Sequence, residues 1–208
     1  MSDGHYFDDD PDTPSSPHPV TVTLPDMTLT LTADRGVFSA GRLDAGTKLL
    51  LLEAPALDDA RSILDIGCGW GPITCVAGHR APRATVWGID VNRRARALTA
   101  ANADATGLGD RVHVGVPDEV PSDLAFDRIL SNPPIRVGKK ALHQLLLRWL
   151  PRLTPDGAAH LVVQKHLGSD SLANWLGEQG FPTSRLSSRA GYRILEVRRG
   201  DNESGKTA

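Results

Sequence analysis

Four consecutive residues offer hydrogen-bond acceptors that suit an amino group. Asn132, Pro133, Pro134 and Ile135 follow closely on an apolar run at 126–130. Because proline has no backbone N–H and keeps the residue before it out of the helical region, we expect Asn132 and Pro133 to be extended. The Asn132 amide oxygen and the Pro133 carbonyl can then converge on one planar amino group, with few backbone donors competing for them. These residues predict a site that holds an –NH2 group.

A glycine-rich turn lies upstream and reads DIGCGWG, from Asp65 to Gly71. An apolar strand, then Gly67, Gly69 and Gly71, then a helix is a geometry in which backbone N–H groups and a helix N-terminus approach a ligand closely. Dinucleotide enzymes use GxGxxG, whereas this turn is GxGxG with Asp65 ahead of it. Asp65 would repel a pyrophosphate and could instead face an ammonium group.

A second carboxylate follows the next strand pattern. Asp90 lies 19 residues after Gly71 (90 − 71), where an acidic side chain typically accepts hydrogen bonds from ribose hydroxyls at a spacing of about 20. An adenosyl ligand with an amino-acid tail fits both Asp65 and Asp90. The alternative for Asp90 is an N-cap for the helix expected at 92–105.

The elements that must position these residues alternate in type from residue 62 onward. The expected strands are 63–66, 85–89, 112–116, 126–130 and 158–163, and the expected helices are 73–79, 92–105, 140–150 and 171–179. Such alternation predicts an α/β fold with a Rossmann-like, doubly wound, mostly parallel sheet. Segments 183–187 and 193–198 predict a C-terminal antiparallel hairpin on the sheet edge.

Ahead of the sheet, alternating apolar and Thr residues at 20–24 and 27–32 predict an N-terminal β-hairpin extension, and 43–53 has helical spacing. Residues 1–18 carry several acids but no Lys or Arg, and predict a disordered acidic arm. With 208 residues and 40% apolar composition, one core is enough. We expect one folded domain at 19–200 and a flexible tail at 201–208.

Several classes of function are poorly matched. The longest apolar run, 49–52, is too short to span a bilayer, and no signal-peptide pattern opens the chain, so a soluble, cytoplasmic protein is expected. Cys68 and Cys75 have no partner pair and no His at metal-ligand spacing, so neither a disulfide nor a metal site is expected. The seven histidines are scattered and no GxSxG motif accompanies them, which disfavours acyl transfer.

The motifs DIGCGWG, GIDVN and SNPPI, in this order, resemble those of class I methyltransferases that use S-adenosylmethionine. The segments GVFSAGRLDAGTKLLL, NPPIRVGKKALH and GYRILEV are similar to the ribosomal RNA small-subunit methyltransferase C group, which methylates guanine N2, and especially to its compact single-domain relatives. The resemblance covers roughly residues 20–199. It implies S-adenosylmethionine as cofactor, ribosomal RNA or the small ribosomal subunit as partner, and a monomer or weak dimer.

The resemblance also implies residue roles. The expected catalytic residues are Asn132, Pro133, Pro134 and Ile135. The expected cofactor-binding residues are Asp65, Gly67, Cys68, Gly69, Gly71, Asp90, Val91, Val116 and Asn132. The expected substrate-binding residues are Phe38, Arg136, Lys139, Lys140 and Lys165.

Two positions depart from the pattern of the group. Ile135 replaces an aromatic residue on which the target commonly stacks, so Phe38 or Tyr192 could supply a ring instead, although a packing role is the alternative for both. After the third strand, Asp118 stands later than the acid that usually receives the adenine amino group, so backbone near Val116 is expected to share that contact.

Three functions stay open at this point. The first is methylation of guanine N2 in small-subunit (16S) ribosomal RNA, in which hydrogen bonds to the amine favour its pyramidal transition state. The second is methylation of a protein glutamine amide, which the same Asn-Pro-Pro platform can hold. The third is a non-catalytic domain that binds the cofactor or RNA, against which the presence of Asp65, the turn glycines, Asp90 and Asn132 argues.

Overall fold

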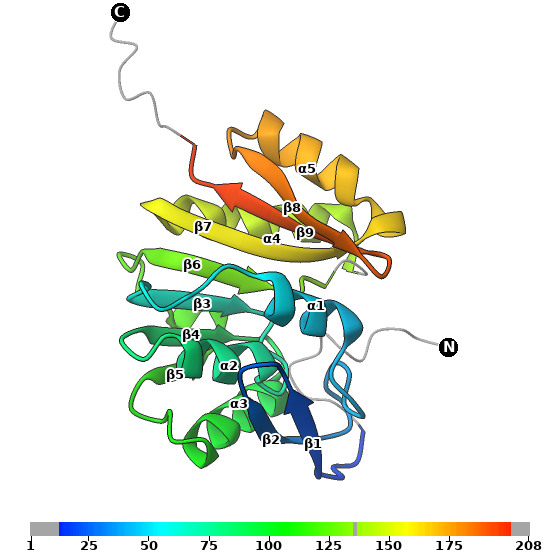
Figure 1. The fold of residues 1–208 in the computed structure, drawn as a ribbon, viewed down its shortest axis with the longest axis vertical. Helices are drawn as coiled ribbons and strands as arrows, with labels where there is room; N and C mark the ends of the chain where they lie inside the picture. Colours follow the sequence, from blue (N-terminus) through cyan, green and yellow to red (C-terminus); the bar gives the residue numbers. More distant parts are fainter. Residues whose placement is uncertain (1–12, 135–136, 201–208) are drawn as a thin grey trace, which may run out of the picture.

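The alternating pattern folds into one seven-stranded sheet with helices on both faces. The computed structural model describes residues 13–134 and 137–200, and the strand order of the large sheet is β5-β4-β3-β6-β7-β9-β8 (Figure 1). Its parallel strands are β3 (Ser62–Ile66), β4 (Thr85–Ile89), β5 (Val112–Gly115), β6 (Phe126–Ser131) and β7 (Leu153–Gln164). The antiparallel edge consists of β8 (Thr183–Arg189) and β9 (Tyr192–Arg198).

Five α-helices of the described chain connect the strands. They are α1 (Ala45–Glu53), α2 (Pro72–Arg80), α3 (Arg93–Ala105), α4 (Lys139–Trp149) and α5 (Ser169–Glu178). Short 3₁₀ turns occur at η1 (Pro117–Glu119), η3 (Leu150–Arg152) and η4 (Lys165–Leu167). The predicted Rossmann-like sheet, its C-terminal hairpin and the N-terminal hairpin extension are all confirmed.

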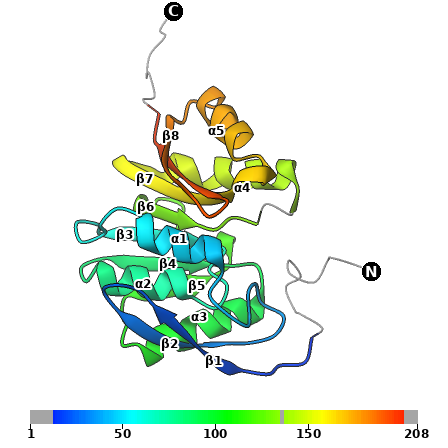
Figure 2. The ribbon, with the colours of Figure 1, turned by 45° about the vertical axis from the view of Figure 1, so that its right-hand side comes forward.

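The core has two layers because successive side chains of a strand point to opposite faces. One layer lies against α1, α2 and α3 and includes Val162 of β7, while the other lies against α4 and α5 and includes Leu161 and Val163. Figures 1 and 2 show these two groups of helices on either side of the sheet. The near-continuous apolar runs of the central strands follow from burial on both faces.

One strand begins earlier than its pattern predicts. The apolar run of β7 starts at residue 158, whereas the strand starts at Leu153 and passes through Pro155 and Gly157, both unfavourable in strands. Phe126 of β6 pairs with Leu153, and the register shifts before Arg128 pairs with Ala158. Pairing with β6 therefore overrides local propensity at this point.

The N-terminal hairpin is a separate two-stranded sheet of β1 (His18–Thr23) and β2 (Thr28–Ala33) that lies beside α3 (Figure 2). Asn102 of α3 accepts a hydrogen bond from the Thr32 backbone N–H at 2.7 Å. Its Nδ2 donates to the Thr32 carbonyl and to the Trp70 carbonyl, each at 2.8 Å. The hairpin is thus tied to α3 and, through the same side chain, to the glycine turn.

The folded unit begins before the expected boundary at residue 19. The buried carboxylate of Asp34 accepts hydrogen bonds from the Ser15 hydroxyl and from the Ser16 backbone N–H, and His18 already belongs to β1. The rest of the expected arm, residues 1–12, and the expected tail at 201–208 lie outside the described residues. In the described ranges, none of the helices combines the length and apolar character needed to cross a membrane.

Candidate active site

Neighbouring strands bring the two sequence motifs together. β3 and β6 pair in parallel with Ile66 opposite Ser131, and the Ser131 hydroxyl donates to the Ile66 carbonyl at 2.8 Å. The next residue of each chain segment is Gly67 on one side and Asn132 on the other. Because the carboxyl ends of parallel strands share one edge of the sheet, the glycine turn and the Asn132 loop leave that edge side by side.

The glycine turn is held open by left-handed backbone. Gly67, Gly69 and Gly71 have φ of 75°, 59° and 92°, values that residues with a Cβ adopt at a cost. The Gly67 and Cys68 N–H groups donate to the Ile89 carbonyl at 2.8 and 3.0 Å, which anchors the turn on β4. A Cβ placed at Gly67 or Gly69 would have no atom within 4 Å, so the surface of the turn faces open space. Pro72 then starts α2, as its fixed φ favours.

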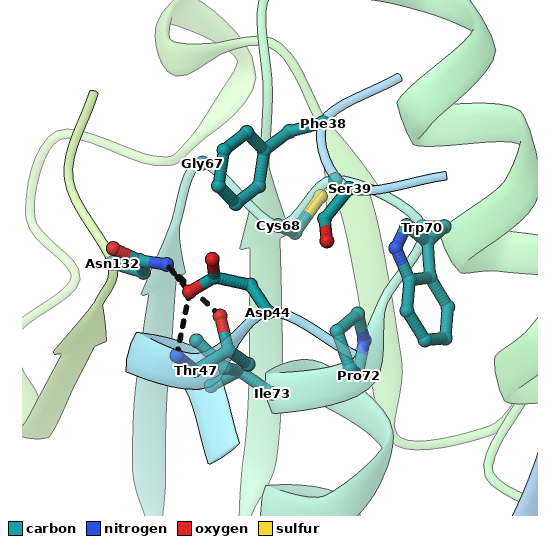
Figure 3. A pocket seen from close by; sticks show the side chains of 11 residues that line it. Phe38, Ser39, Asp44, Thr47, Gly67, Cys68, Trp70, Pro72, Ile73 and Asn132 are labelled. Carbon is teal, nitrogen blue, oxygen red and sulfur yellow. Dashed lines mark hydrogen bonds between the residues drawn. The ribbon is translucent and has the colours of Figure 1, made fainter. Parts of the chain in front are cut away.

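The Asn132 side chain has a defined orientation (Figure 3). Its Nδ2 donates to Asp44 Oδ2 at 2.8 Å and to Thr47 Oγ1 at 3.0 Å. A carboxylate can only accept hydrogen bonds, so the nitrogen of the amide must face Asp44. The Asn132 Oδ1 atom consequently points away from both partners and is presented as an acceptor.

One carboxylate oxygen of Asp44 accepts two hydrogen bonds. Asp44 is the N-cap of α1, where its Oδ2 accepts from the Thr47 backbone N–H at 3.0 Å, and the same oxygen holds Asn132. Neither Asp44 nor Thr47 is among the predicted site residues. An Asp directly before a helical segment signals an N-cap. Nothing in the sequence alone shows that this N-cap lies against Asn132.

A pocket opens between these elements (Figure 3). Of the predicted residues, it is lined by Phe38, Gly67, Cys68, Gly69 and Asn132. The other lining residues are Ser39, Asp44, Thr47, Trp70, Pro72 and Ile73. Its volume is only about 30 Å³, and it opens toward the surface of the glycine turn.

Asp65 lies beneath the turn and not on its surface. It is fully buried, Oδ2 accepts from the Thr74 hydroxyl at 2.6 Å, and Oδ1 has no partner in the described part of the chain. Burial raises the pKa of Asp65 to about 7, and the nearby Asp90 adds to the effect. The free protein therefore holds an unsatisfied acidic group directly under the glycines.

Asp90 supports the turn from the side. Its Oδ2 accepts from the Gly69 N–H at 3.0 Å and its Oδ1 from the Asn92 N–H at 2.9 Å. The alternative that Asp90 caps the following helix is wrong, because Asn92 is the N-cap of α3 and accepts from the Ala95 N–H. The neighbouring Val91 is 43% exposed.

The residues that follow β5 form hydrogen bonds and an ion pair with other residues of the chain. The Val116 N–H donates to Glu119 Oε2 at 2.9 Å, and the exposed Asp118 carboxylate forms an ion pair with Arg148 at 2.6 Å. Neither residue lines the pocket beside Asn132. The Val116 carbonyl in turn accepts from the Glu119 N–H at 3.0 Å, so both backbone groups of Val116 have partners within the chain, and the expected adenine contact stays a prediction.

The predicted substrate-binding residues lie on the same rim. Lys139 and Lys140 are exposed at the start of α4, and Lys165 is exposed directly after β7. Phe38 is 54% exposed and lines the pocket, whereas Tyr192 packs against Gly46 in the core layer, so the packing alternative applies to Tyr192 alone. Ile135 and Arg136 lie outside the described residues.

The cysteines do not contribute reactive groups. Cys68 and Cys75 are free and buried, and burial raises the pKa of both thiols. Within residues 13–134 and 137–200, no group of three or more His, Cys, Asp and Glu side chains could hold a metal ion.

Known proteins are similar to this chain in sequence. The family model described as the methyltransferase small domain matches residues 28–196. The uncharacterized protein YbxB of Bacillus subtilis is 34% identical over 200 residues, which cover 94% of this chain and 98% of YbxB. Ribosomal RNA small subunit methyltransferase C of Hahella chejuensis is 34% identical over 176 residues, which cover 82% of this chain and 49% of that protein.

A solved structure shares the fold. The Thermus thermophilus 16S rRNA N2 G1207 methyltransferase, solved with AdoMet and guanosine, superposes with a TM-score of 0.74 at 24% identity. The superposition covers 91% of this chain and 52% of that one. The chain thus spans nearly all of YbxB and about half the length of these two methyltransferases.

Proposed function

Because this chain belongs to the methyltransferase small domain family, we propose that it transfers a methyl group from S-adenosylmethionine to the exocyclic N2 amine of a guanine in small-subunit ribosomal RNA. The orientation of Asn132 carries the proposal. With its nitrogen held by Asp44 and Thr47, the amide offers Oδ1 to a planar amine, beside the glycine turn. The name of the Hahella chejuensis relative supports the choice of ribosomal RNA.

The residues present fit the cofactor. A ligand with a sulfonium and an ammonium group is attracted by carboxylates, and Asp44 lines the pocket while the unpartnered Asp65 Oδ1 lies beneath the turn, among the described residues. Gly67 and Gly69 leave space for a ligand, and Asp90 has lone pairs for ribose hydroxyls. S-adenosylmethionine supplies, when bound, a methyl group activated for in-line transfer.

The chain's own residues orient the methyl acceptor. The amine donates one N–H to Asn132 Oδ1 and the other to the Pro133 carbonyl, which proline's geometry keeps extended. A conjugated amine is planar and weakly nucleophilic, and two acceptors arranged around a pyramidal nitrogen stabilise the transition state more than the ground state. The nitrogen loses its proton after transfer, so no strong base has to act beforehand. Positioning accounts for most of the catalysis.

The deciding experiment is transfer of radiolabelled methyl groups to small ribosomal subunits and to their RNA. We expect label in guanine N2, and a loss of about a hundredfold or more in kcat for Asn132→Ala. The matched control is Asn174→Ala, which changes an exposed asparagine on α5. Full activity of Asn132→Ala would contradict the assignment of Asn132.

Two other experimental results would favour one of the alternative functions over the proposed one. Label in a protein glutamine, with RNA unlabelled, identifies the amide of a protein as the acceptor. Calorimetry that detects no binding of S-adenosylmethionine leaves a non-catalytic domain. Each result is read independently of the other, because cofactor binding is measured without any acceptor.

A further inference from the structure

A second cavity lies on the opposite face of the sheet from the Asn132 pocket. It has a volume of about 300 Å³, and its lining includes Lys139, Leu142 and His143 of α4, Val163 of β7, and Ser171 and Leu172 of α5. It shares no lining residue with the pocket beside Asn132. Figure 1 shows the starts of α4 and α5 on the same side of the molecule.

The cavity has the size and lining of a small-molecule site. Its volume is at the lower end of the range of about 300–1,000 Å³ for such pockets. Leu142, Val163 and Leu172 form an apolar interior, while His143 contributes a flat ring that stacks on Trp175 with ring centroids 3.4 Å apart and planes 13° apart. A flat, partly polar ligand is the shape that suits these walls.

The polar groups favour a ligand that carries oxygen acceptors. Burial, and then the charge of Lys139, lower the pKa of His143, so the neutral ring has one donor and one acceptor nitrogen. Lys139 stands at the wall and Lys165 is exposed nearby in sequence at the end of β7. Their charge complements a phosphate.

A buried cation lies on the strand beside one lining residue of the cavity. Arg193 of β9 pairs with Val163 of β7, so both side chains are on the same face of the sheet. Arg193 is 6% exposed, its Nη1 donates to Ser169 Oγ and to Asp170, and its Nε has no partner in the described part of the chain. Asp170 is therefore paired with a cation and does not stand as a free carboxylate that would repel an anionic ligand.

From these observations we infer that the cavity binds one unpaired nucleotide of the substrate RNA that neighbours the methylated guanine, with its base between the apolar wall and His143 and its phosphate toward Lys139. This inference rests on the proposed function. The target guanine itself belongs at Asn132, on the other face. A second contact with the RNA strand adds recognition that Asn132, Pro133 and Pro134 alone do not provide.

Binding is tested first without any methylation. Guanosine 5′-monophosphate is titrated to millimolar concentration into the protein with isotope-labelled histidines, and the imidazole NMR signals are followed. We expect a saturable shift of His143 and none of His79, which is exposed on α2. No shift at His143 overturns the cavity as a nucleotide site, whatever the methylation assay gives.

The second arm measures methyl transfer to small-subunit RNA. His143→Ala and the cavity-filling Ser171→Trp are expected to raise the KM for RNA about tenfold, the effect of losing one stacked base, and to leave the affinity for S-adenosylmethionine unchanged. The controls are His79→Ala and Asn174→Trp, which make matched changes at exposed positions. Unchanged KM in both cavity variants overturns the inference while the proposed function stands. A His143 shift without methylation of RNA means that the cavity binds a nucleotide while the proposed function is wrong.

Discussion

At the scale of single residues, one carboxylate sets the orientation of the Asn132 amide. Asp44 Oδ2 accepts from the Asn132 side chain and from the backbone of α1. In Asp44→Ala, the oxygen that accepts from Asn132 Nδ2 is lost, so Asn132 is no longer held in one orientation. We predict a loss of about 2 kcal/mol in transition-state stabilisation, or roughly thirtyfold in kcat, measured by steady-state methyl transfer.

The controls separate orientation from packing. Thr47→Ser keeps the hydroxyl that accepts from Asn132 and should retain near wild-type kcat, whereas Thr47→Val keeps the shape and should lose several-fold. Asp58→Asn removes a charge from an exposed site and should change nothing. If Asp44→Ala matches the wild type, Asn132 does not depend on this contact.

Asp65 gives the free protein a distinctive pH dependence. Its pKa is raised by burial from 3.8 to about 7. Because the folded state binds this proton more tightly, the stability that Asp65 contributes is present at about pH 4 and is lost as the pH rises through about 7. Relative to Asp65→Asn, the wild-type free energy of unfolding should fall by about 4 kcal/mol across that window, since a shift of one unit is about 1.4 kcal/mol.

The measurement is urea unfolding of both proteins between pH 4 and pH 8. The difference between them cancels the titration of the other groups, including His160, whose pKa is lowered by burial. A difference that stays constant with pH would mean that Asp65 is ionised in the folded protein throughout. The sequence pattern puts Asp65 at the turn but does not predict this burial, which depends on how α2 covers the end of β3.

At the scale of elements, the glycine turn combines a backbone requirement with an open surface. Gly69→Ala would place a Cβ in left-handed backbone, at a cost of about 1 kcal/mol. It would also project the methyl group into the space above the turn. We predict that affinity for S-adenosylmethionine, measured by calorimetry, falls at least tenfold.

The chain supplies a matched control for this prediction. Gly107, between α3 and β5, has φ of 75°, and a Cβ at this position would likewise have no atom within 4 Å. Gly107→Ala should lower stability by a similar amount and leave cofactor affinity unchanged. Equal affinities for the two variants would show that the turn surface is not where the cofactor lies.

The type of each element was predictable because the hydrophobic periodicity and the residues that begin and end each element agree along the chain. The strands and helices from residue 62 onward lie within a few residues of their expected positions, since each apolar run is bounded by Gly, Pro or a capping residue. The early start of β7 was not predictable, because Pro155 and Gly157 argue locally against a strand that only pairing with β6 stabilises. Likewise, the cap at Asp44 was readable but its contact with Asn132, 88 residues away, was not.

At the scale of the whole molecule, Asn102 joins the N-terminal hairpin to the glycine turn. It bonds the Thr32 backbone on one side and the Trp70 carbonyl on the other. We predict that Asn102→Ala lowers the free energy of unfolding by about 2 kcal/mol, because a buried carbonyl of the turn loses its donor. Urea unfolding should show a lower midpoint with an unchanged slope.

The exposed Asn174→Ala serves as the control and should stay within about 0.5 kcal/mol of the wild type. Because Trp70 lies in the glycine turn, affinity for S-adenosylmethionine should also weaken several-fold in Asn102→Ala. A stability loss with unaltered affinity would mean that the hairpin supports the fold but not the turn.

The pairing of β3 with β6 fixes a spacing that sequence divergence cannot change. Gly67 and Asn132 leave adjacent strands whose separation is the sheet spacing of about 4.8 Å, a length that no side-chain replacement alters. The spacing between the glycine turn and the Asn132 loop is therefore inherited with the backbone. Loops and helices around the rim are free to change, while the spacing of these two segments stays the same.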